Sequence, residues 1–296
     1  MSVMNASPPT FAALPHHPPP GTPTPPPEPI TSPFTYTFPQ HKLNRRLTQP
    51  NKIPVVLVAC GSFSPITTLH LQMFQMTQRA TENTEFEVVG KYLSPVSDAY
   101  GKASLVPAFH RIAMCTLAAE DECKSRIMID PWETLRHDEE GEPIYTRTAD
   151  VLRHFDYEIN DVLGGVRAVD GTALRARVVL LIGADVAMTM GDPKIWAPSD
   201  LDVLLGYYGA FIVERPTQTD IQEAIKPLKK YHKNIWVVNS YYNDVSSSKI
   251  RAQLQNGESV LDDLPSTVYQ YIKVHQLYQP KAPNGQAHKL STEADR

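Results

Sequence analysis

Apolar residues along this chain gather into short continuous runs that alternate with stretches of helical periodicity. The short runs predict buried strands, because they are rich in β-branched residues and are bounded by turn residues. They lie within residues 54–60, 86–93, 126–132, 178–185, 204–215 and 234–240. Stretches in which apolar residues recur at helical spacing predict amphipathic helices. These are residues 68–80, 107–121, 145–159, 246–257 and 265–278.

The order of these segments predicts the class of fold. Strands that alternate with helices, and that are apolar on both faces, indicate an α/β protein with an open parallel sheet covered by helices on both sides. In such sheets, ligands bind beyond the carboxyl ends of the strands. The residues that follow each strand are therefore the first candidates for a functional site.

Both ends of the chain depart from this pattern. Residues 1–50 hold about half of the 27 prolines and little apolar mass, which predicts a disordered or polyproline-like tail. Such a tail is either a docking site for proline-binding modules or a solubilising extension, and we favour the second interpretation. One folded domain is expected over residues 51–279, and residues 280–296 predict a second disordered tail. Inside the domain, the glycine-interrupted segment 163–177 predicts a mobile loop.

Charge and composition argue against several classes of protein. The net charge of −4 and the isoelectric point near 6.2 give no electrostatic basis for binding nucleic acid or an anionic membrane. The apolar runs are too short to cross a bilayer, and no secretory signal is visible. The three cysteines lack metal-type spacing, which predicts reduced thiols in an intracellular protein. Any phosphate site must therefore come from a local cluster of polar and basic groups.

The segment after the first strand, CGSFSPITTLH, has the features of a phosphate-binding turn. Gly61 leaves backbone N–H groups accessible, and Thr67 has the type and position of a helix N-cap. His70 then falls in the first turn of that helix, where its imidazole can donate to a phosphoryl oxygen. The alternative is a capped helix whose histidine packs against the sheet.

A late segment, NDVSSSKIR, predicts a second anion site at a helix N-terminus. Asn243 and the serines that follow it are capping residue types. Ser248, Lys249 and Arg251 surround the first turn, so backbone N–H groups, a hydroxyl and two cations meet there. The alternative is an ordinary capped helix with solvated basic side chains.

Together, the two segments suit a chain of three phosphates with a metal ion between them. Phosphoryl-type transfer needs positioning and charge neutralisation more than a covalent nucleophile, and no nucleophile is evident. Fingerprints of other nucleotide sites are missing. The dinucleotide motif needs Gly-x-Gly-x-x-Gly where only Gly61 is found, and no Gly-Lys-Ser/Thr of a Walker A loop follows.

These segments and several others resemble one known family. GSFSPITTLH resembles the [HT]-x-x-H signature of the nucleotidyltransferase superfamily. SPVSDAYGK, LIGAD, IWAPSDL, YGAFIVER and NDVSSSKIR resemble, in this order, the eukaryotic nicotinamide/nicotinate mononucleotide adenylyltransferases. The match covers roughly residues 54–278, and the ordered set is specific to this branch. It implies a Rossmann-like nucleotidyltransferase domain over residues 51–279.

The resemblance implies that ATP and nicotinamide or nicotinate mononucleotide form NAD or deamido-NAD and pyrophosphate, by direct attack of the mononucleotide phosphate. Magnesium is expected to bridge the ATP phosphates without protein ligands of its own. The implied catalytic residues are His70, at the α-phosphate, and Arg251. The implied ATP-binding residues are Gly61, Ser62, Phe63, Thr67, His70, Lys102, Asn243, Ser248, Lys249 and Arg251.

The pyridine ring needs an aromatic face. By the resemblance, its stacking partners are Trp196 and Tyr145. The implied mononucleotide-binding residues are Tyr100, Tyr145, Thr148, Gly183, Asp185, Ile195 and Trp196. Core packing is the alternative role of Trp196. Trp132 is the alternative ring, and we interpret it as structural, with Glu133 holding a loop.

Other functions stay open at this point. Another transferase of the superfamily, such as a cytidylyl- or phosphopantetheine-type enzyme, is the nearest, and a non-catalytic nucleotide-binding scaffold or chaperone is the second. The missing glycine fingerprint disfavours an NAD-dependent oxidoreductase. Family members commonly form dimers or larger rings, so the resemblance implies a homo-oligomer with small-molecule nucleotides as partners. We expect a location in the nucleus, the cytoplasm or both, and the sequence does not separate the two mononucleotides.

Overall fold

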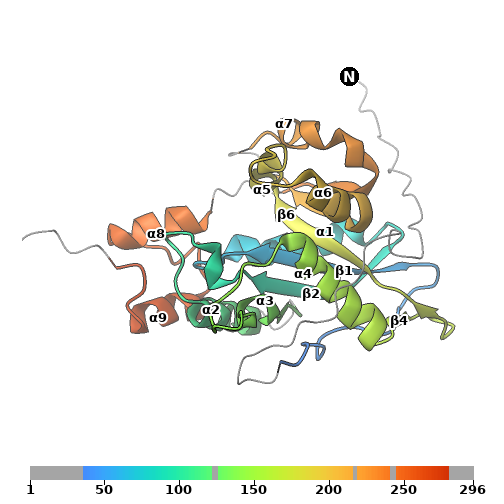
Figure 1. Ribbon diagram of the computed structural model, residues 1–296, viewed down its shortest axis with the longest axis horizontal. Coiled ribbons are helices and arrows are strands. Elements are labelled where there is room, and N and C mark those ends of the chain that lie inside the picture. Colours follow the sequence, from blue (N-terminus) through green and yellow to red (C-terminus); the bar gives the residue numbers. More distant parts are fainter. Residues whose placement is uncertain (1–35, 122–125, 216–218, 241–244, 280–296) are drawn as a thin grey trace, which may run out of the picture.

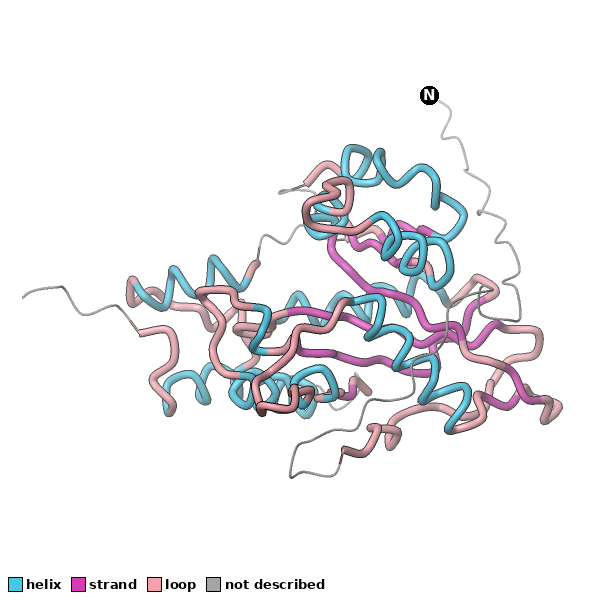
Figure 2. The backbone as a smooth tube through the Cα atoms, in the orientation of Figure 1, coloured by secondary structure: helices cyan, strands magenta, loops and turns pink. Residues whose placement is uncertain are grey.

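The computed structural model describes residues 36–121, 126–215, 219–240 and 245–279. Its centre is a six-stranded parallel sheet in the order β3-β2-β1-β6-β7-β8 (Figures 1 and 2). The strand order reverses beside β1, because β2 lies on one side of it and β6 on the other. A parallel sheet binds ligands at such a switch point, so the carboxyl end of β1 is the favoured place for a site.

All six predicted strands are present, although their lengths differ widely. The sheet strands are β1 (Ile53–Gly61), β2 (Phe86–Pro95), β3 (Met128–Ile129), β6 (Arg177–Gly183), β7 (Ala210–Val213) and β8 (Ile235–Val238). A separate antiparallel pair is formed by β4 (Val166–Arg167) and β5 (Ala173–Leu174).

Helices connect the strands and cover the sheet. They are α1 (Thr68–Thr81), α2 (Ala108–Asp121), α3 (Trp132–Leu135), α4 (Thr148–Asp156), α5 (Ala184–Thr189), α6 (Pro198–Leu201), α7 (Ile221–Ile225), α8 (Ser247–Gln255) and α9 (Ser266–Val274). Short 3₁₀ segments span Asp98–Tyr100 and Lys226–Asn234, and π-helical segments extend α4 and α6 over Tyr157–Val162 and Asp202–Tyr208. Within the described ranges, no helix is both long enough and apolar enough to cross a membrane.

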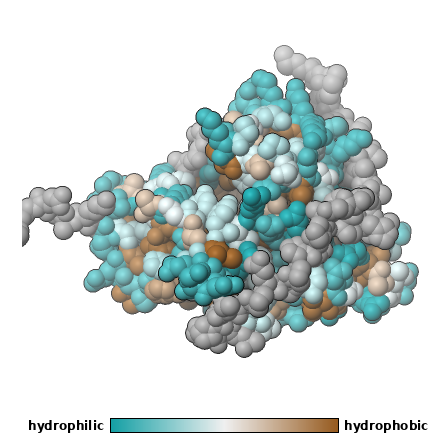
Figure 3. Space-filling view, viewed as in Figure 1, coloured by the Kyte–Doolittle hydropathy of each residue, from teal (hydrophilic) through white to brown (hydrophobic). Residues whose placement is uncertain are grey.

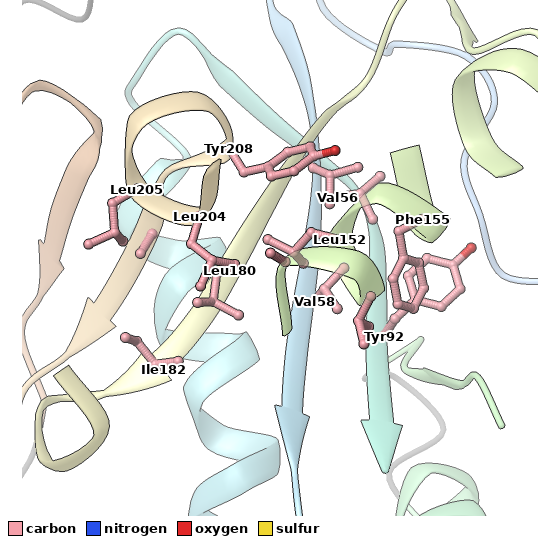
Figure 4. Close-up of a cluster of buried hydrophobic side chains, with 14 of the residues drawn as sticks. Val56, Val58, Tyr92, Leu152, Phe155, Leu180, Ile182, Leu204, Leu205 and Tyr208 are labelled. Carbon is pink, nitrogen blue, oxygen red and sulfur yellow. The ribbon is translucent and has the colours of Figure 1, made fainter. Parts of the chain in front are cut away.

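Hydrophobic clusters fill both faces of the sheet. Alternate residues of β1 point to opposite faces, as a pleated strand requires: Val56 and Val58 join one cluster, and Val55 and Leu57 join the other. Figure 4 shows the first cluster, in which side chains of α4 and of the segment before β7 lie on β1, β2 and β6. Helices α1, α2, α8 and α9 contribute to the second cluster. The predicted open parallel sheet with helices on both faces is therefore confirmed.

Residues 36–50 correct the predicted boundary of the N-terminal tail. Phe38, Leu43 and Leu47 are buried in the first cluster instead of lying in a disordered tail. The backbone N–H of Asn44 also donates to the carbonyl of Val89 in β2 at 2.8 Å. The boundary was misplaced because the proline content was averaged over residues 1–50. That average does not register three apolar side chains whose burial stabilises the segment. For residues 1–35, which lie outside the described part, the tail stays a prediction.

The glycine-interrupted segment 163–177 contains a short hairpin where a loop was predicted. Val166 pairs with Leu174 in its two-stranded sheet. Gly165 has a φ of 71°, and a Cβ there would lie 2.2 Å from the carbonyl oxygen of Leu174. Only glycine fits this close approach of two backbones, so the glycine permits the hairpin.

The surface shown in Figure 3 is largely polar. Apolar residues form small groups that polar residues interrupt, and most exposed large apolar side chains are isolated. A pair of half-exposed tyrosines, Tyr100 and Tyr145, is an exception, because their rings stack at a centroid distance of 6.1 Å. This aromatic pair lies at the carboxyl side of the sheet, where the site is built.

Candidate active site

Helix α1 begins in the turn after β1, and its first residues carry the histidine expected to bind phosphate. Thr67 is the N-cap, and its hydroxyl accepts from the backbone N–H of His70 at 3.4 Å. In return, Nδ1 of His70 accepts from the backbone N–H of Thr67 at 3.1 Å, which completes a capping box. The cap and the place of His70 in the first turn are as predicted.

The capping box also fixes the tautomer of His70, and its surroundings set its charge. Because Nδ1 accepts a hydrogen bond, the neutral ring carries its proton on Nε2, on the opposite side from Thr67. Burial, followed by the positive charge of Arg215, lowers the pKa of His70 to about 4, against a smaller opposite effect of Asp185. His70 is therefore a neutral hydrogen-bond donor near pH 7.

Gly61 and Phe63 shape the turn that precedes this helix. A Cβ on Gly61 would lie 3.1 Å from the ring of Phe63, so the ring already fills that space. Phe63 has a φ of 44°, in the left-handed region that bulky residues rarely occupy. Its ring is buried and meets the His70 ring edge-on at 5.3 Å. Phe63 thus supports the turn from inside, and strain of this kind is typical of functional sites.

Helix α8 packs its N-terminus against the same turn. Ser246 is the N-cap, and its hydroxyl accepts from the backbone N–H of Lys249 at 3.2 Å. The hydroxyl of Ser247 donates to the carbonyl oxygen of Pro65 at 2.8 Å. The two segments that the sequence singled out, far apart along the chain, therefore meet in space.

Arg251 forms the second link between α8 and the turn. Its Nη1 donates to the carbonyl oxygen of Ser64 at 2.7 Å, and its Nη2 donates to the hydroxyl of Ser248 at 3.0 Å. Burial lowers the pKa of this guanidinium, which nevertheless stays charged near pH 7. Arg251 thus holds the turn, whereas Ser248 and Lys249 are exposed at the helix mouth.

The ends of β6 and β7 add an ion pair beside His70. A Cβ on Gly183 would lie 2.4 Å from Oδ1 of Asp185, so the carboxylate needs a glycine beneath it. Arg215 donates from Nη1 to Oδ2 of Asp185 at 3.0 Å and from Nη2 to the carbonyl of Val245 at 2.6 Å. Sequence reasoning pointed to this strand end but did not single out Arg215.

Arg111 in α2 is a second arginine that the sequence analysis missed. It is fully buried and ties the turn after β1 to the loop after β2. Its guanidinium donates to the carbonyls of Ser62, Val96 and Val106 and to the carboxylate of Asp98, at 3.3, 2.7, 2.9 and 2.7 Å. A buried charge with this set of acceptors is stable because each of its three nitrogens donates to at least one acceptor.

Two of the rings expected around pyridine lie on neighbouring elements. Tyr100 and Tyr145 are exposed and stack on each other at an angle of 26°. Trp196 is half-buried against the first cluster, and its indole N–H donates to Thr189 at 3.0 Å. Trp196 therefore combines core packing with partial exposure.

The segments of Tyr145 and Trp196 are joined by an ion pair. Arg147 lies between Tyr145 and Thr148, the first residue of α4, and pairs with Asp200 in α6 at 3.5 Å. Ile195, beside Trp196, is exposed. The ion pair therefore links the segment that carries Tyr145 to the helix that follows Trp196.

The structure describes only some of the remaining predicted residues. Lys102 is exposed in the loop after Tyr100, and Ser62 lies in the turn after β1. Asn243, expected at the adenine end, lies outside the described residues. Among the described residues, no group of three or more His, Cys, Asp or Glu side chains is arranged to hold a metal ion.

Trp132 packs in the interior, as the interpretation of it as structural requires. Its ring stacks on His154 at a centroid distance of 4.1 Å. The neighbouring Glu133 is buried and accepts from the hydroxyl of Ser94 at 3.3 Å. Burial raises the pKa of Glu133 to about 8, although hydrogen bonds from Ser94 and Ser97 and the charge of Arg111 oppose the shift.

Comparison with known proteins decides the family. Residues 58–253 match the cytidylyltransferase-like family. Over 248 residues, the chain is 46% identical to nicotinamide/nicotinic acid mononucleotide adenylyltransferase 1 of Saccharomyces cerevisiae, covering 82% of this chain and 60% of the yeast protein. The Arabidopsis thaliana enzyme of the same name is 34% identical over 81% of this chain and 97% of the plant protein. The chain belongs to the nicotinamide/nicotinic acid mononucleotide adenylyltransferase family.

A solved structure agrees with this family at the level of the fold. A Plasmodium falciparum nicotinic acid mononucleotide adenylyltransferase complexed with NaAD superimposes with a TM-score of 0.52 at 18% identity, over 76% of this chain and 97% of that one. Against the budding-yeast members of the adenylyltransferase family, the chain spans about 60% of their length. The matched part includes the turn after β1 and the start of α8, which carry the candidate site.

Proposed function

We propose that this protein transfers AMP from ATP to nicotinamide mononucleotide or nicotinate mononucleotide and releases pyrophosphate. The observation that carries the proposal is the meeting of two anion-binding helix starts, that of α1 with His70 and that of α8 with Ser248 and Lys249. Hydrogen bonds from Ser247 and from Arg251 hold the second against the turn that precedes the first. The names of the family members support the substrates.

The reaction needs no covalent enzyme intermediate. A phosphate oxygen of the mononucleotide attacks the α-phosphorus of ATP, the new P–O bond forms, and the bond to the bridging oxygen of pyrophosphate breaks. The N–H on Nε2 of His70 donates to an oxygen of the α-phosphate and stabilises the charge that builds up there. Its neutral state suits this task, because the ring stays protonated on Nε2 over the physiological pH range.

The rest of the triphosphate lies at the mouth of α8. The hydroxyl of Ser248, the ammonium of Lys249 and the N-terminal backbone N–H groups bind the β- and γ-phosphates. Arg251 positions these groups by holding the turn, and Lys102 approaches the phosphates from its exposed loop. By the family resemblance, Asn243, which lies outside the described residues, is expected at the adenine end. Magnesium held by phosphate oxygens and water would supply further charge neutralisation.

The pyridine mononucleotide binds on the other side of His70. Its ring stacks between Tyr145 and Trp196, with Tyr100, Thr148 and Ile195 lining the same space. The carboxylate of Asp185 accepts from ribose hydroxyls while Arg215 holds it in place. This arrangement sets the mononucleotide phosphate on the opposite side of the α-phosphorus from the leaving pyrophosphate.

A coupled assay of NAD formation with each mononucleotide and a titration of magnesium tests the proposal. We expect pyrophosphate release with ATP plus at least one pyridine mononucleotide, dependence on the metal, and a large loss in the His70→Ala variant. Absence of pyrophosphate with both mononucleotides overturns the proposal. Release with CTP and another phosphate acceptor then identifies a different transferase of the superfamily. Nucleotide binding without turnover then identifies a scaffold.

We also propose a homo-oligomer located in the nucleus, the cytoplasm or both, and a solubilising role for the proline-rich segment. The family resemblance supports the first two points, and the composition of residues 1–35 supports the third. Analytical ultracentrifugation measures the assembly. A labelled full-length chain locates the protein in cells, and a panel of proline-binding modules tests for a partner of the tail.

A further inference from the structure

Three planar side chains, those of His154, Trp132 and Arg136, stack on one another. The indole of Trp132 lies parallel to the imidazole of His154, at 4.1 Å and an angle of 2°. The guanidinium carbon of Arg136 lies over the same indole at 4.9 Å from its centroid. Arg136 therefore lies within range of cation–π attraction to Trp132, an interaction that a planar guanidinium makes well.

Buried hydrogen bonds fix the lower end of this stack. Nε2 of His154 lies 3.0 Å from Oδ2 of Asp130, and the hydroxyl of Tyr36 donates to Oδ1 of the same carboxylate at 3.0 Å. The Tyr36 hydroxyl also lies 3.0 Å from Nε2 of His154. Burial and the charge of Asp130 raise the pKa of Tyr36, so it stays a neutral donor. The Asp130 carboxylate and the Tyr36 hydroxyl hold the imidazole, and with it Trp132, in one orientation.

The upper end of the stack holds the segment that carries Tyr145. Nη1 of Arg136 donates to the hydroxyl oxygen of Thr146 at 2.8 Å, and the carbonyl of Arg136 accepts from the N–H of Ile144 at 3.1 Å. Thr146 is buried, whereas Tyr145 is exposed. Arg136 therefore binds the residues on both sides of Tyr145.

We propose that Arg136 is a positioning residue that sets the place of the Tyr145 ring, and so the affinity for the pyridine mononucleotide. The proposal rests on the proposed function, because it assigns the stacking role to Tyr145. Trp132, His154, Asp130 and Tyr36 form its support. The N-terminal segment that contains Tyr36 thereby contributes to substrate binding without touching the substrate.

The bond between Arg136 and Thr146 can be removed with little change of shape. Thr146→Val keeps the branched side chain but loses the acceptor, and Thr146→Ser restores a hydroxyl. Arg136→Gln removes the guanidinium from the upper face of Trp132. As a control, Arg175→Gln makes the same change at an arginine that pairs with Asp156 and Asp161 near the hairpin and takes no part in the site.

The experiment measures KM for nicotinamide mononucleotide and for ATP separately, together with calorimetric binding of nicotinamide mononucleotide and the melting temperature of each variant. We expect Thr146→Val and Arg136→Gln to raise KM and Kd for the mononucleotide by about tenfold, because a displaced stacking ring loses its geometry. KM for ATP should change by less than about twofold, as for substitutions distant from a binding group. Thr146→Ser and Arg175→Gln should resemble the wild type.

The outcomes separate this inference from the proposed function. If the wild type forms NAD and the two variants show unchanged mononucleotide affinity, Arg136 has no positioning role. Equal losses for both substrates, with a lowered melting temperature, assign Arg136 to general stability and also overturn the inference. If the wild type neither forms NAD nor binds nicotinamide mononucleotide, the proposed function itself fails, and this inference fails with it.

Discussion

Nη1 of Arg251 donates to the carbonyl oxygen of Ser64 at 2.7 Å, although 187 positions separate the two residues. A charge-assisted bond of this kind is stronger than a neutral one, and here it joins α8 to the turn after β1. The same guanidinium reaches Ser248 at 3.0 Å. One side chain thus sets the distance between the two halves of the proposed triphosphate site.

Replacing Arg251 should reduce turnover more than it reduces stability. Arg251→Lys keeps the charge but cannot span Ser64 and Ser248 with a fixed planar group. We expect a loss of kcat of at least about tenfold and a loss of about 1 to 3 kcal/mol in the free energy of unfolding. Steady-state assays and urea unfolding measure both. Ser247→Ala, which removes only the neutral bond to Pro65, should lower the free energy of unfolding by about 1 kcal/mol. If Ser247→Ala lowered kcat as much as Arg251→Lys does, Arg251 would have no special role.

His70 should titrate far below its ordinary range. Burial and the charge of Arg215 lower the pKa of His70 from its ordinary value of 6.5 to about 4. The neutral ring therefore contributes to the free energy of unfolding in full above pH 6.5, and this contribution is lost as the pH falls through about 4. Nitrogen NMR of labelled histidine between about pH 3 and about pH 8 should show the proton on Nε2 at neutral pH. A pKa near the ordinary value would remove the structural basis of this assignment.

The same residue should matter for turnover and little for folding. His70→Ala removes the proposed donor to the α-phosphate, and loss of one such donor typically lowers kcat by about 10² to 10³. The melting temperature should fall only slightly, because Thr67 still caps the helix through its hydroxyl. Assays of pyrophosphate release give the rate, and a variant with unchanged kcat would exclude contact with the reacting phosphate.

Trp196 should contribute to the affinity for the mononucleotide and not to the affinity for ATP. Trp196→Ala removes the ring proposed to stack on pyridine. Because such an aromatic pair contributes about 1 kcal/mol beyond its buried area, KM for the mononucleotide should rise. KM for ATP should stay near the wild-type value. Trp196→Phe keeps an aromatic face and should recover part of the affinity. If alanine only lowers the melting temperature, Trp196 belongs to the core.

Glu133 should make stability depend on pH in a direction opposite to most carboxylates. Burial raises its pKa from 4.5 to about 8, so the folded protein holds a proton that the unfolded chain loses near pH 4.5. This bound proton contributes to the free energy of unfolding in full below pH 4.5. Above it, the contribution falls by up to about 1.4 kcal/mol per pH unit until the pH exceeds about 8. The melting temperature of Glu133→Gln relative to the wild type should therefore rise between about pH 5 and about pH 8. A constant difference would place Glu133 in its ionised form.

The N-terminal segment should contribute measurably to stability. Phe38 packs against Tyr92 and Phe155 at centroid distances of 5.4 and 5.8 Å. Phe38→Ala should cost about 3 to 5 kcal/mol in the free energy of unfolding. Urea unfolding measures it, with the exposed Phe109→Ala as the matched control. Equal, small costs for both variants would show that residues 36–50 detach easily.

Local patterns predicted most of the fold, because each strand and cap depends on near neighbours. The run at 54–60 became β1, and Thr67 and Ser246 cap the helices that follow them. The boundary of the N-terminal tail was wrong, since composition averaged over a window cannot reveal a few well-spaced apolar residues such as Phe38.

The two predicted phosphate-binding segments followed from local motifs and the pyridine-binding residues from the family resemblance, but their supports did not. Arg111 looks like an ordinary polar position on an amphipathic helix, yet its acceptors are backbone carbonyls of distant loops. Arg215 and Arg136 bind side chains that only the tertiary structure brings near. No pattern within one segment encodes such partners, because they depend on the strand order. The one available signal was that Arg215 ends a segment predicted to hold a strand.

The contact between the turn after β1 and α8 also has a consequence for biosynthesis. A ribosome that adds 5–20 residues per second needs about 10 to 40 s to pass from Ser64 to Arg251. During that interval the nascent chain carries its histidine helix without the partner that completes the proposed triphosphate site. That site is therefore assembled late in translation, whichever part of the sheet condenses first.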